Sequence, residues 1–413
     1  MARRVVVTGM GAVTPIGNSV KEFWEGLLEG RNGVDYITRF DASQHKTKFA
    51  AEVKNVNFDD VLDRRERNRV DLYAAFAMKA AKEAMEDAGV DLEKLNRDRA
   101  GVVVGSGIGG ILSFETEHAK MLKHGPRRVS PYFVPQMISD IAAGHISIRY
   151  KLTGPNYATV SACATASHAI GDAVRLIRYG DADFMVAGGS EAAICPMGVA
   201  GFNSMQALST RNDDPKHASR PFDRLRDGFV IGEGCGILIL EELEHAKKRG
   251  AQIYAEIRGV GFTADAYHIT APAPGGEGAR RAMRMCVEDG GLNLDEIDYI
   301  NAHGTSTPYN DKSETEAIKA LFGEHAYKLN VSSTKSMTGH LLGAAGAIEL
   351  IATVLAVKHN VVPPTINYQE PDPECDLNYT PNQPQERVVR AAINNAFGFG
   401  GHNACISVSK FVE

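Results

Sequence analysis

Cys163 is the residue whose sequence surroundings most favour chemistry. It lies in ATVSACATASHAIGDA (158–173), where small residues predominate and no Asp, Glu, Lys or Arg occurs before Asp172. A strand-like stretch precedes the cysteine, and a helix-like stretch follows it. A helix N-terminus offers unpaired N–H groups and a positive dipole end, which stabilise a thiolate and lower its pKa. The segment predicts an activated nucleophile, against the alternative of a small buried cysteine that only packs the helix.

Two histidines occur in loops of the kind that could serve this nucleophile. His303 lies in NAHGTSTPYND (301–311), after a strand-like IDYI, and His340 lies in SSTKSMTGHLLGAAGAIE (332–349). The same loops carry other polar side chains, Thr305, Thr307 and Lys335. Loops at strand ends form the ligand crevice of open α/β sheets. A lone histidine is usually structural or on the surface, but two in such loops favour a shared site.

A Gly-rich segment, NAFGFGGHN (395–403), could complete this site. Its backbone N–H groups could stabilise an oxyanion, although an ordinary turn has the same composition. Other catalytic motifs are weak or absent. GSGIGG (105–110) fits GxGxxG, but no acidic residue follows about twenty positions later, so we expect a tight turn rather than a dinucleotide site. The absence of GxSxG and HExxH argues against a serine hydrolase and a zinc protease.

The elements that must position these residues alternate along the chain. Four short apolar runs are typical of buried strands: residues 4–9, 100–107, 183–190 and 234–242. Residues 68–89 have helical apolar spacing and end at a glycine stop signal. Alternation of continuous apolar strands with helices predicts an α/β fold with parallel strands buried on both faces.

The two halves of the sequence resemble each other weakly and in the same order. The paired segments are 5–14 with 255–264, 101–110 with 297–307, the helix after Cys163 with 339–351, and 184–192 with 392–401. The pairing predicts two related α/β halves joined near residues 247–252. Residues 1–250 would carry the nucleophilic cysteine, and residues 251–413 would carry both histidines. Chance similarity between α/β units is the alternative.

The composition bounds the function. The chain has 413 residues, 23% of them charged, and a net charge of −6, which describes a large globular protein and argues against nucleic acid. Six cysteines form no CxxC pair and no zinc-finger spacing, so we expect a reducing compartment and no metal. The N-terminus reads as a strand rather than a signal peptide, which favours the cytoplasm. Residues 341–357 are apolar but carry Glu349, which favours a buried helix over a membrane span.

Four of these segments in this order resemble the β-ketoacyl-[acyl carrier protein] synthases, most closely the elongating synthase II group. They are 158–173, 301–311, 332–346 and 395–403, and the resemblance runs from residues 5–18 nearly to the C-terminus. It implies a thiolase-like fold of two related halves in a five-layer αβαβα arrangement. It also implies a homodimer and a carrier protein as partner, with no cofactor besides the phosphopantetheine on that carrier.

The resemblance implies a role for each site residue. Cys163 would take the acyl chain as a thioester, and the backbone N–H groups of Cys163 and Phe399 would form the oxyanion hole. His303 and His340 would stabilise the enolate formed when the malonyl group loses carbon dioxide, and Phe399 would gate malonyl entry. The remaining expected residues are Lys335, Glu349 and Asp311 in support, and Thr270, Thr305 and Thr307 near the malonyl and pantetheine end.

The acyl pocket and the docking surface also follow from the resemblance. The expected pocket residues are Ile108, Gly198, Phe202 and Leu342, with Phe133 reaching toward the pocket of the partner subunit. The carrier protein is acidic, and complementary charge speeds encounter. The expected docking residues are Arg65, Arg67, Arg69, Arg127 and Arg128.

Other proteins of this fold remain as alternatives at this stage. A polyketide ketosynthase would keep the same three catalytic residues and differ in pocket and partner. A silent ketosynthase partner would lack the cysteine, which Cys163 argues against. A thiolase would carry a second catalytic cysteine in the GFGG loop, and residues 398–401 contain none.

Overall fold

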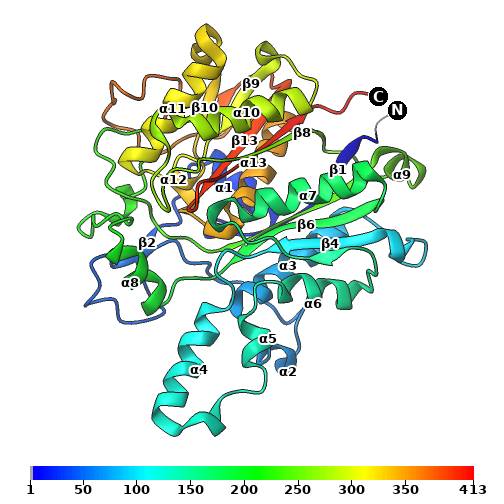
Figure 1. Cartoon of the computed structure of the whole chain (residues 1–413), viewed down its shortest axis with the longest axis vertical. Helices are drawn as coiled ribbons and strands as arrows, with labels where there is room; N and C mark the ends of the chain where they lie inside the picture. Colours follow the sequence, from blue (N-terminus) through cyan, green and yellow to red (C-terminus); the bar gives the residue numbers. More distant parts are fainter. Residues whose placement is uncertain (1–2) are drawn as a thin grey trace.

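The computed structural model describes residues 3–413 and is built on one ten-stranded mixed sheet, so residues 1 and 2 of the expected first half lie outside it (Figure 1). The first half supplies β1 (Val5–Val13), β4 (Ala100–Gly105), β5 (Asn156–Tyr157), β6 (Phe184–Glu191) and β7 (Gly234–Glu242). The second half supplies β8 (Ala255–Ala264), β9 (Ile297–Asn301), β10 (Asn330–Ser332), β13 (Ala391–Gly398) and β14 (His402–Ser409).

The strand order repeats between the halves, as the paired sequence segments predict. It reads β1-β7-β6-β4-β5 in one direction and β8-β14-β13-β9-β10 in the other. The two halves meet where β1 pairs antiparallel with β8 over Val5–Val7 and Ala255–Ile257. Equivalent strands therefore lie at equivalent distances from a central seam.

The expected parallel strands make up only part of the sheet. Only β5-β4-β6 and β10-β9-β13 pair in parallel, and the other neighbours are antiparallel. The physical reason lies in the connections. A crossover helix must separate parallel strands, whereas β13 returns directly to β14 through a tight turn. Gly400 and Gly401 adopt positive φ of 90° and 72° in that turn, a conformation that glycine tolerates best.

Helices cover the sheet in layers, which confirms the predicted thiolase-like arrangement (Figure 1). The central pair is α7 (Thr165–Tyr179) and α13 (Ala345–His359), whose apolar side chains share one core with strands of both halves. The outer layers are α3 (Leu72–Asp87) with α6 (Ile141–Tyr150) and α10 (Glu277–Asp289) with α11 (Pro308–Phe322). Ala-rich α3 lets the sheet approach closely, because Ala84 and Ala80 face Gly9 and Gly11 of β1.

The remaining elements are short or peripheral. They are α1 (Val20–Leu28), α2 (Arg64–Arg67), α4 (Ile111–His124), α5 (Phe133–Met137), α8 (Pro196–Ser204), α9 (Leu243–Lys248), α12 (Lys335–Thr338), and the strand pairs β2 (Asp35–Tyr36) with β3 (Phe49–Ala50) and β11 (Val361–Val362) with β12 (Gln385–Glu386). Helix α4 projects away from the body, with α5 and α2 beside its base (Figure 1).

Helix α13 is apolar on all sides, as a helix in the middle of a protein should be. The stretch Leu342–His359 is long and apolar enough to cross a membrane by length and composition alone, yet 89% of it is buried inside the molecule. A core helix passes the same test. The expected buried helix is therefore observed.

Candidate active site

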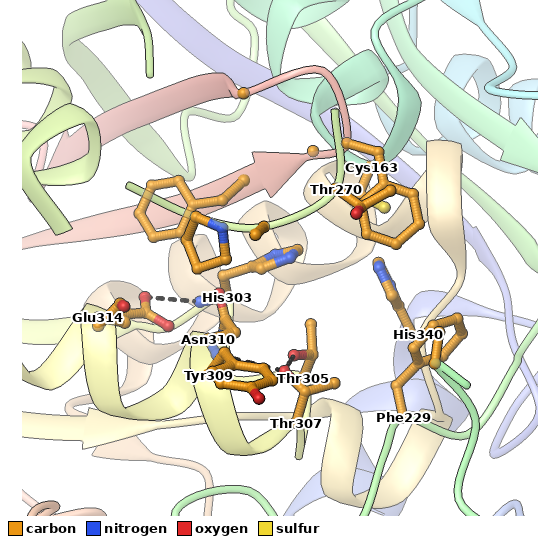
Figure 2. A pocket seen from close by; sticks show the side chains of 18 of the residues that line it. Cys163, Phe229, Thr270, His303, Thr305, Thr307, Tyr309, Asn310, Glu314 and His340 are labelled. Atoms are coloured by element: carbon orange, nitrogen blue, oxygen red, sulfur yellow. Dashed lines mark hydrogen bonds between the residues drawn. The ribbon is translucent and has the colours of Figure 1, made fainter. Parts of the chain in front are cut away.

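Residues from both halves line one cavity of about 740 Å³ (Figure 2). Nine of the expected site residues lie on its wall: Cys163, Phe202, Thr270, His303, Thr305, Thr307, His340, Leu342 and Phe399. Lys335, Glu349 and Asp311 are buried behind the wall. Ile108, Phe133 and Gly198 are not among the residues that line this cavity, and their roles stay predictions.

Cys163 stands on a strained turn at the start of α7. The short 3₁₀ turn Ala162–Ala164 precedes the helix, and Ala162 adopts a positive φ of 51°. Such a conformation is costly for a residue with a side chain and is common at functional sites. The strand expected just before the cysteine is only the two-residue β5, so the turn rather than a strand presents the thiol.

The turn after β13 lies directly against the nucleophile. The Phe399 backbone N–H acts on the Cys163 sulfur and lowers the pKa of its thiol. A Cβ placed on Gly398 would stand 3.0 Å from the Cys163 amide nitrogen and 2.7 Å from the Ser161 carbonyl oxygen. The amides of Cys163 and Phe399 thus flank the same sulfur, which is where an acyl oxyanion would form.

This contact predicts the effect of Gly398→Ala. The added methyl group meets backbone rather than a flexible side chain, so the turn or the nucleophile must shift. We expect acyl transfer to Cys163 to slow by at least about tenfold, since a displacement of about 1 Å can cost 10²-fold. The rate is measured by quenching the loading reaction at successive times and determining the intact mass of the protein. Gly201→Ala is the matched control, because a Cβ there meets nothing within 4 Å. An unchanged rate in Gly398→Ala would contradict the proposed oxyanion contact.

The expectation of a lowered thiol pKa is wrong for the unloaded site. Burial raises the pKa of Cys163 to about 12, and the Lys335 charge and the Phe399 N–H only partly oppose this. The helix N-terminus is present, but the side chain is 9% exposed and packs among apolar residues such as Val199 and Phe229. The thiol is therefore neutral at rest and loses its proton as it attacks.

The two imidazoles face each other across the cavity. Their ring centroids are 5.3 Å apart with the planes at 85°, and both rings point into the space beside Cys163 (Figure 2). The Leu342 backbone N–H donates to Nδ1 of His340 at 3.3 Å, which leaves the proton of a neutral ring on Nε2. The backbone of His340 bonds to Val230 and Gly232, so the ring is held from both sides.

Both histidines are held neutral. Burial and the Lys335 charge lower the pKa of His303 and of His340 well below the usual 6.5. Lys335 is itself buried in an ion pair with Glu349, and burial raises the pKa of that carboxyl to about 7. A neutral imidazole can donate one N–H to a developing enolate oxygen without first losing a charge.

The lowered pKa values predict the pH dependence of the step that uses the histidines. We expect the rate of condensation on preloaded Cys163 to stay level from about pH 8 to about pH 5.5, since imidazoles gain a proton only below their pKa. Single-turnover product formation measures this step, with acyl loading followed in parallel. A loss of half the rate near pH 6.5 would show that an ordinary histidine controls the step.

Sequence reasoning missed two buried carboxylates. Glu314 accepts the backbone N–H groups of His303 and Gly304, each at 2.8 Å. Glu191, at the end of β6, accepts from the amides of Gly107 and Gly343, each at 2.9 Å. Each carboxylate therefore holds a loop that borders the cavity. An acidic residue at the end of an apolar strand is the signal that could have revealed Glu191.

This fold and this cysteine–histidine site define the class of thiolase-like ketosynthases. The family model for the beta-ketoacyl synthase N-terminal domain matches residues 2–246, and that for the C-terminal domain matches residues 254–369. The chain belongs to the beta-ketoacyl synthase family, which confirms the resemblance.

Named relatives cover the whole chain. A 3-oxoacyl-[acyl-carrier-protein] synthase 2 from Synechocystis is 54% identical over 99% of this chain and 98% of its own length. The protein of the same name from Coxiella burnetii is 51% identical over 100% and 99%. A solved beta-ketoacyl synthase from Burkholderia phymatum superposes with a TM-score of 0.93 at 37% identity, covering 99% of this chain and 100% of that one. A second solved structure is described as a type II PKS acyl-carrier protein in complex with its ketosynthase. It also superposes with a TM-score of 0.93, at 37% identity, and covers 100% of both chains.

Proposed function

We propose that this enzyme elongates fatty acyl chains by two carbons on acyl carrier protein. It joins an acyl chain held on Cys163 to malonyl-carrier protein, and carbon dioxide and a 3-oxoacyl-carrier protein leave. The observation that best supports this proposal is that one cavity combines the Cys163 thiol, two neutral imidazoles and the Phe399 N–H. The 51–54% identity to synthase 2 relatives supports fatty acid elongation.

The first half-reaction loads the enzyme. The Cys163 sulfur attacks the acyl thioester carbonyl and loses its proton, and the carrier thiol leaves with a proton in its place. Backbone amides of Cys163 and Phe399 stabilise the oxyanion. Apolar residues around the sulfur, among them Phe202 and Leu342, suit the acyl chain.

The second half-reaction uses the histidines. The bond to the malonyl carboxylate breaks, carbon dioxide leaves, and the electron pair forms an enolate. His303 and His340 donate N–H groups to the enolate oxygen, which is how such a step proceeds without a metal. The enolate carbon attacks the thioester, and the Cys163 thiolate leaves and is reprotonated. Thr270, Thr305 and Thr307 lie on the cavity wall. In this proposal, the malonyl and pantetheine groups enter beside them.

Partners are part of the proposal. The five candidate docking residues are exposed arginines, and their positive charge suits an acidic carrier protein. They lie on α2, just after α2 and in the short turn Pro126–Arg128: Arg65, Arg67, Arg69, Arg127 and Arg128. The projecting α4–α5 region exposes Phe114, Leu122 and Val134, which supports a homodimer in which Phe133 reaches the partner subunit. We place the enzyme in the cytoplasm.

A polyketide ketosynthase is the second candidate. The solved ketosynthase bound to a hexaketide has the same fold at 37% identity, and the same three residues would serve it. The higher identity to synthase 2 relatives favours fatty acid substrates.

Intact mass of the protein tests the proposal directly. The protein is mixed with a long-chain acyl-carrier protein and then with malonyl-carrier protein. We expect a gain of one acyl mass, its loss after malonyl addition, and release of a 3-oxoacyl-carrier protein two carbons longer. Loading without 3-oxoacyl product, or no loading with any chain length, would refute the proposed elongation.

A further inference from the structure

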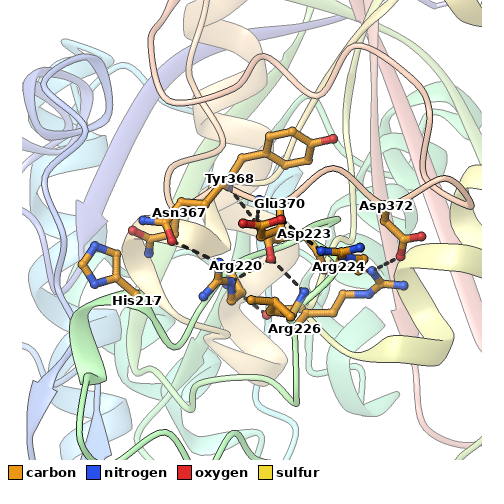
Figure 3. Close-up of polar contacts among 12 residues, drawn as sticks. His217, Arg220, Asp223, Arg224, Arg226, Asn367, Tyr368, Glu370 and Asp372 are labelled. Atoms are coloured by element: carbon orange, nitrogen blue, oxygen red, sulfur yellow. Dashed lines mark hydrogen bonds and ion pairs between the residues drawn. The ribbon is translucent and has the colours of Figure 1, made fainter.

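A buried network of arginines and carboxylates joins residues 220–226 to residues 367–372 (Figure 3). It joins residues 220–228 and residues 367–372 to the beginning of α11. The side chains of Arg220 and Arg226 are 3% and 5% exposed, and that of Asp223 is fully buried. Charged side chains are almost never this buried unless they are paired, so the network calls for an explanation.

Arg226 is the member that reaches the active-site loop. Its Nε donates to the Thr307 carbonyl oxygen at 3.2 Å, and its Nη2 donates to the Pro308 carbonyl oxygen at 3.1 Å. Its Nη1 donates to the Asp372 carboxylate at 2.6 Å. Nε also lies 3.7 Å from the Asp311 carboxylate. One side chain thus ties the first turn of α11 to a distant segment.

This placement is not explained by stability alone. The N-terminus of a helix is positive and disfavours a cation, so the guanidinium depends on Asp311 and Asp372 to offset its charge. Buried ion pairs stabilise a fold little compared with apolar residues of the same size. The two carbonyl contacts instead constrain position, because the planar guanidinium donates in set directions.

Ser306 shows what the network constrains. Its φ is 68°, in the left-handed region that a serine rarely adopts. Its amide donates to Asp311 at 3.2 Å, its hydroxyl accepts from the Arg220 amide at 2.9 Å, and its carbonyl accepts from the Gly228 amide at 3.1 Å. A strained residue persists only when its surroundings over-determine it.

We propose that Arg226 is a positioning residue for the malonyl half-reaction. Resting on the function proposed above, it sets the place of Thr305 and Thr307, whose hydroxyls bond at 2.9 Å on the cavity wall, and steadies the loop that carries His303. Cys163 belongs to the turn before α7, on another element, so the acyl-transfer step itself, measured at saturating acyl-carrier protein, does not depend on Arg226.

Arg226→Met tests this separation of the two half-reactions. We expect kcat/KM for malonyl-carrier protein to fall tenfold or more, with KM rising, because a displacement of about 1 Å can cost about 10²-fold. Single-turnover loading of Cys163 at saturating acyl-carrier protein, followed by intact mass, should stay within about twofold of wild type, since its amide donors are untouched. The loading readout also reports whether the variant is folded.

Arg224→Met is the matched control. Arg224 lies in the same segment, its side chain is 58% exposed, and among residues 3–413 its guanidinium pairs only with Glu370, at 3.1 Å (Figure 3). An exposed pair contributes little, so both half-reactions should stay within about twofold. Arg226→Lys should recover part of the malonyl step, because one ammonium cannot reach both carbonyls and the carboxylate.

Several outcomes would overturn the inference. Equal losses of loading and condensation in Arg226→Met would assign the residue a general structural role, and unchanged malonyl kinetics would assign it none. If Arg226→Met does not fold, Asp372→Asn takes its place, with a smaller loss expected in the malonyl step alone. The wild-type protein, measured beside the variants, distinguishes a failure of the inference from a failure of the proposed function. If the wild type forms no 3-oxoacyl product, the proposed function is wrong, and the inference about Arg226 is wrong with it.

Discussion

Cys163→Ala is expected to remain unacylated by any acyl-carrier protein. Cys163 carries the only thiol among the residues that line the cavity, beside the Phe399 amide and the two imidazoles, so alanine removes the covalent route. We expect 3-oxoacyl product formation to fall by about 10³-fold or more, since removing a catalytic nucleophile can cost about 10⁶ in kcat. Intact mass measures loading, and product analysis measures turnover.

Cys195→Ala is the control for this variant. Cys195 is also a buried free thiol, it caps α8 by accepting from the Gly198 amide at 3.4 Å, and it is not on the cavity wall. We expect it to load and turn over as wild type does, with a modest loss of stability. An acyl mass on Cys163→Ala would place the nucleophile elsewhere and remove the basis of the mechanism.

His340→Ala is expected to slow condensation by about 10²–10³-fold, the usual cost of removing one donor from an oxyanion. The Nε2 proton of His340 faces the cavity because Nδ1 is occupied by the Leu342 amide. The loss should fall on the malonyl step more than on loading, because backbone amides hold the oxyanion of the loading step. Single-turnover rates of the two steps, measured on one preparation, give the comparison.

His359→Ala controls for the loss of an imidazole. His359 ends α13, stacks on Trp24 at 5.6 Å between ring centroids, and lies off the cavity wall. Both steps should proceed at the wild-type rate in that variant. If His340→Ala loses loading as severely as condensation, then His340 serves as the base for the thiol, and the division of labour drawn here is incorrect.

Local patterns in the chain predicted the main elements well. The helix expected within residues 68–89 is α3, and the four apolar runs became β1, β4, β6 and β7. Apolar periodicity and glycine stops are local, so they can be read without knowing the contacts. The prediction of parallel strands holds for only part of the sheet, because strand direction depends on which strands meet in the sheet and not on residue type.

The thiol and the positioning residues show where local reasoning ends. The position of Cys163 at the start of α7 suggested a lowered pKa for its thiol. Burial among residues from distant segments instead raises that pKa. Arg226 belongs to no catalytic motif. Its proposed role arises only because the folded chain brings residues 307–308 and 372 within hydrogen-bond distance of it. Desolvation and long-range hydrogen bonds are properties of the folded chain.

The sequence by itself determined which residues could react: a cysteine at a small-residue helix start, two histidines in strand-end loops, and a Gly-rich turn. Residue type and local spacing carry that information. Only the tertiary structure decided that these groups share one cavity, that Lys335 and burial keep both imidazoles neutral, and that the thiol starts protonated. Those properties depend on the distance between charges and on the exclusion of water, which are set by contacts between residues far apart in the chain.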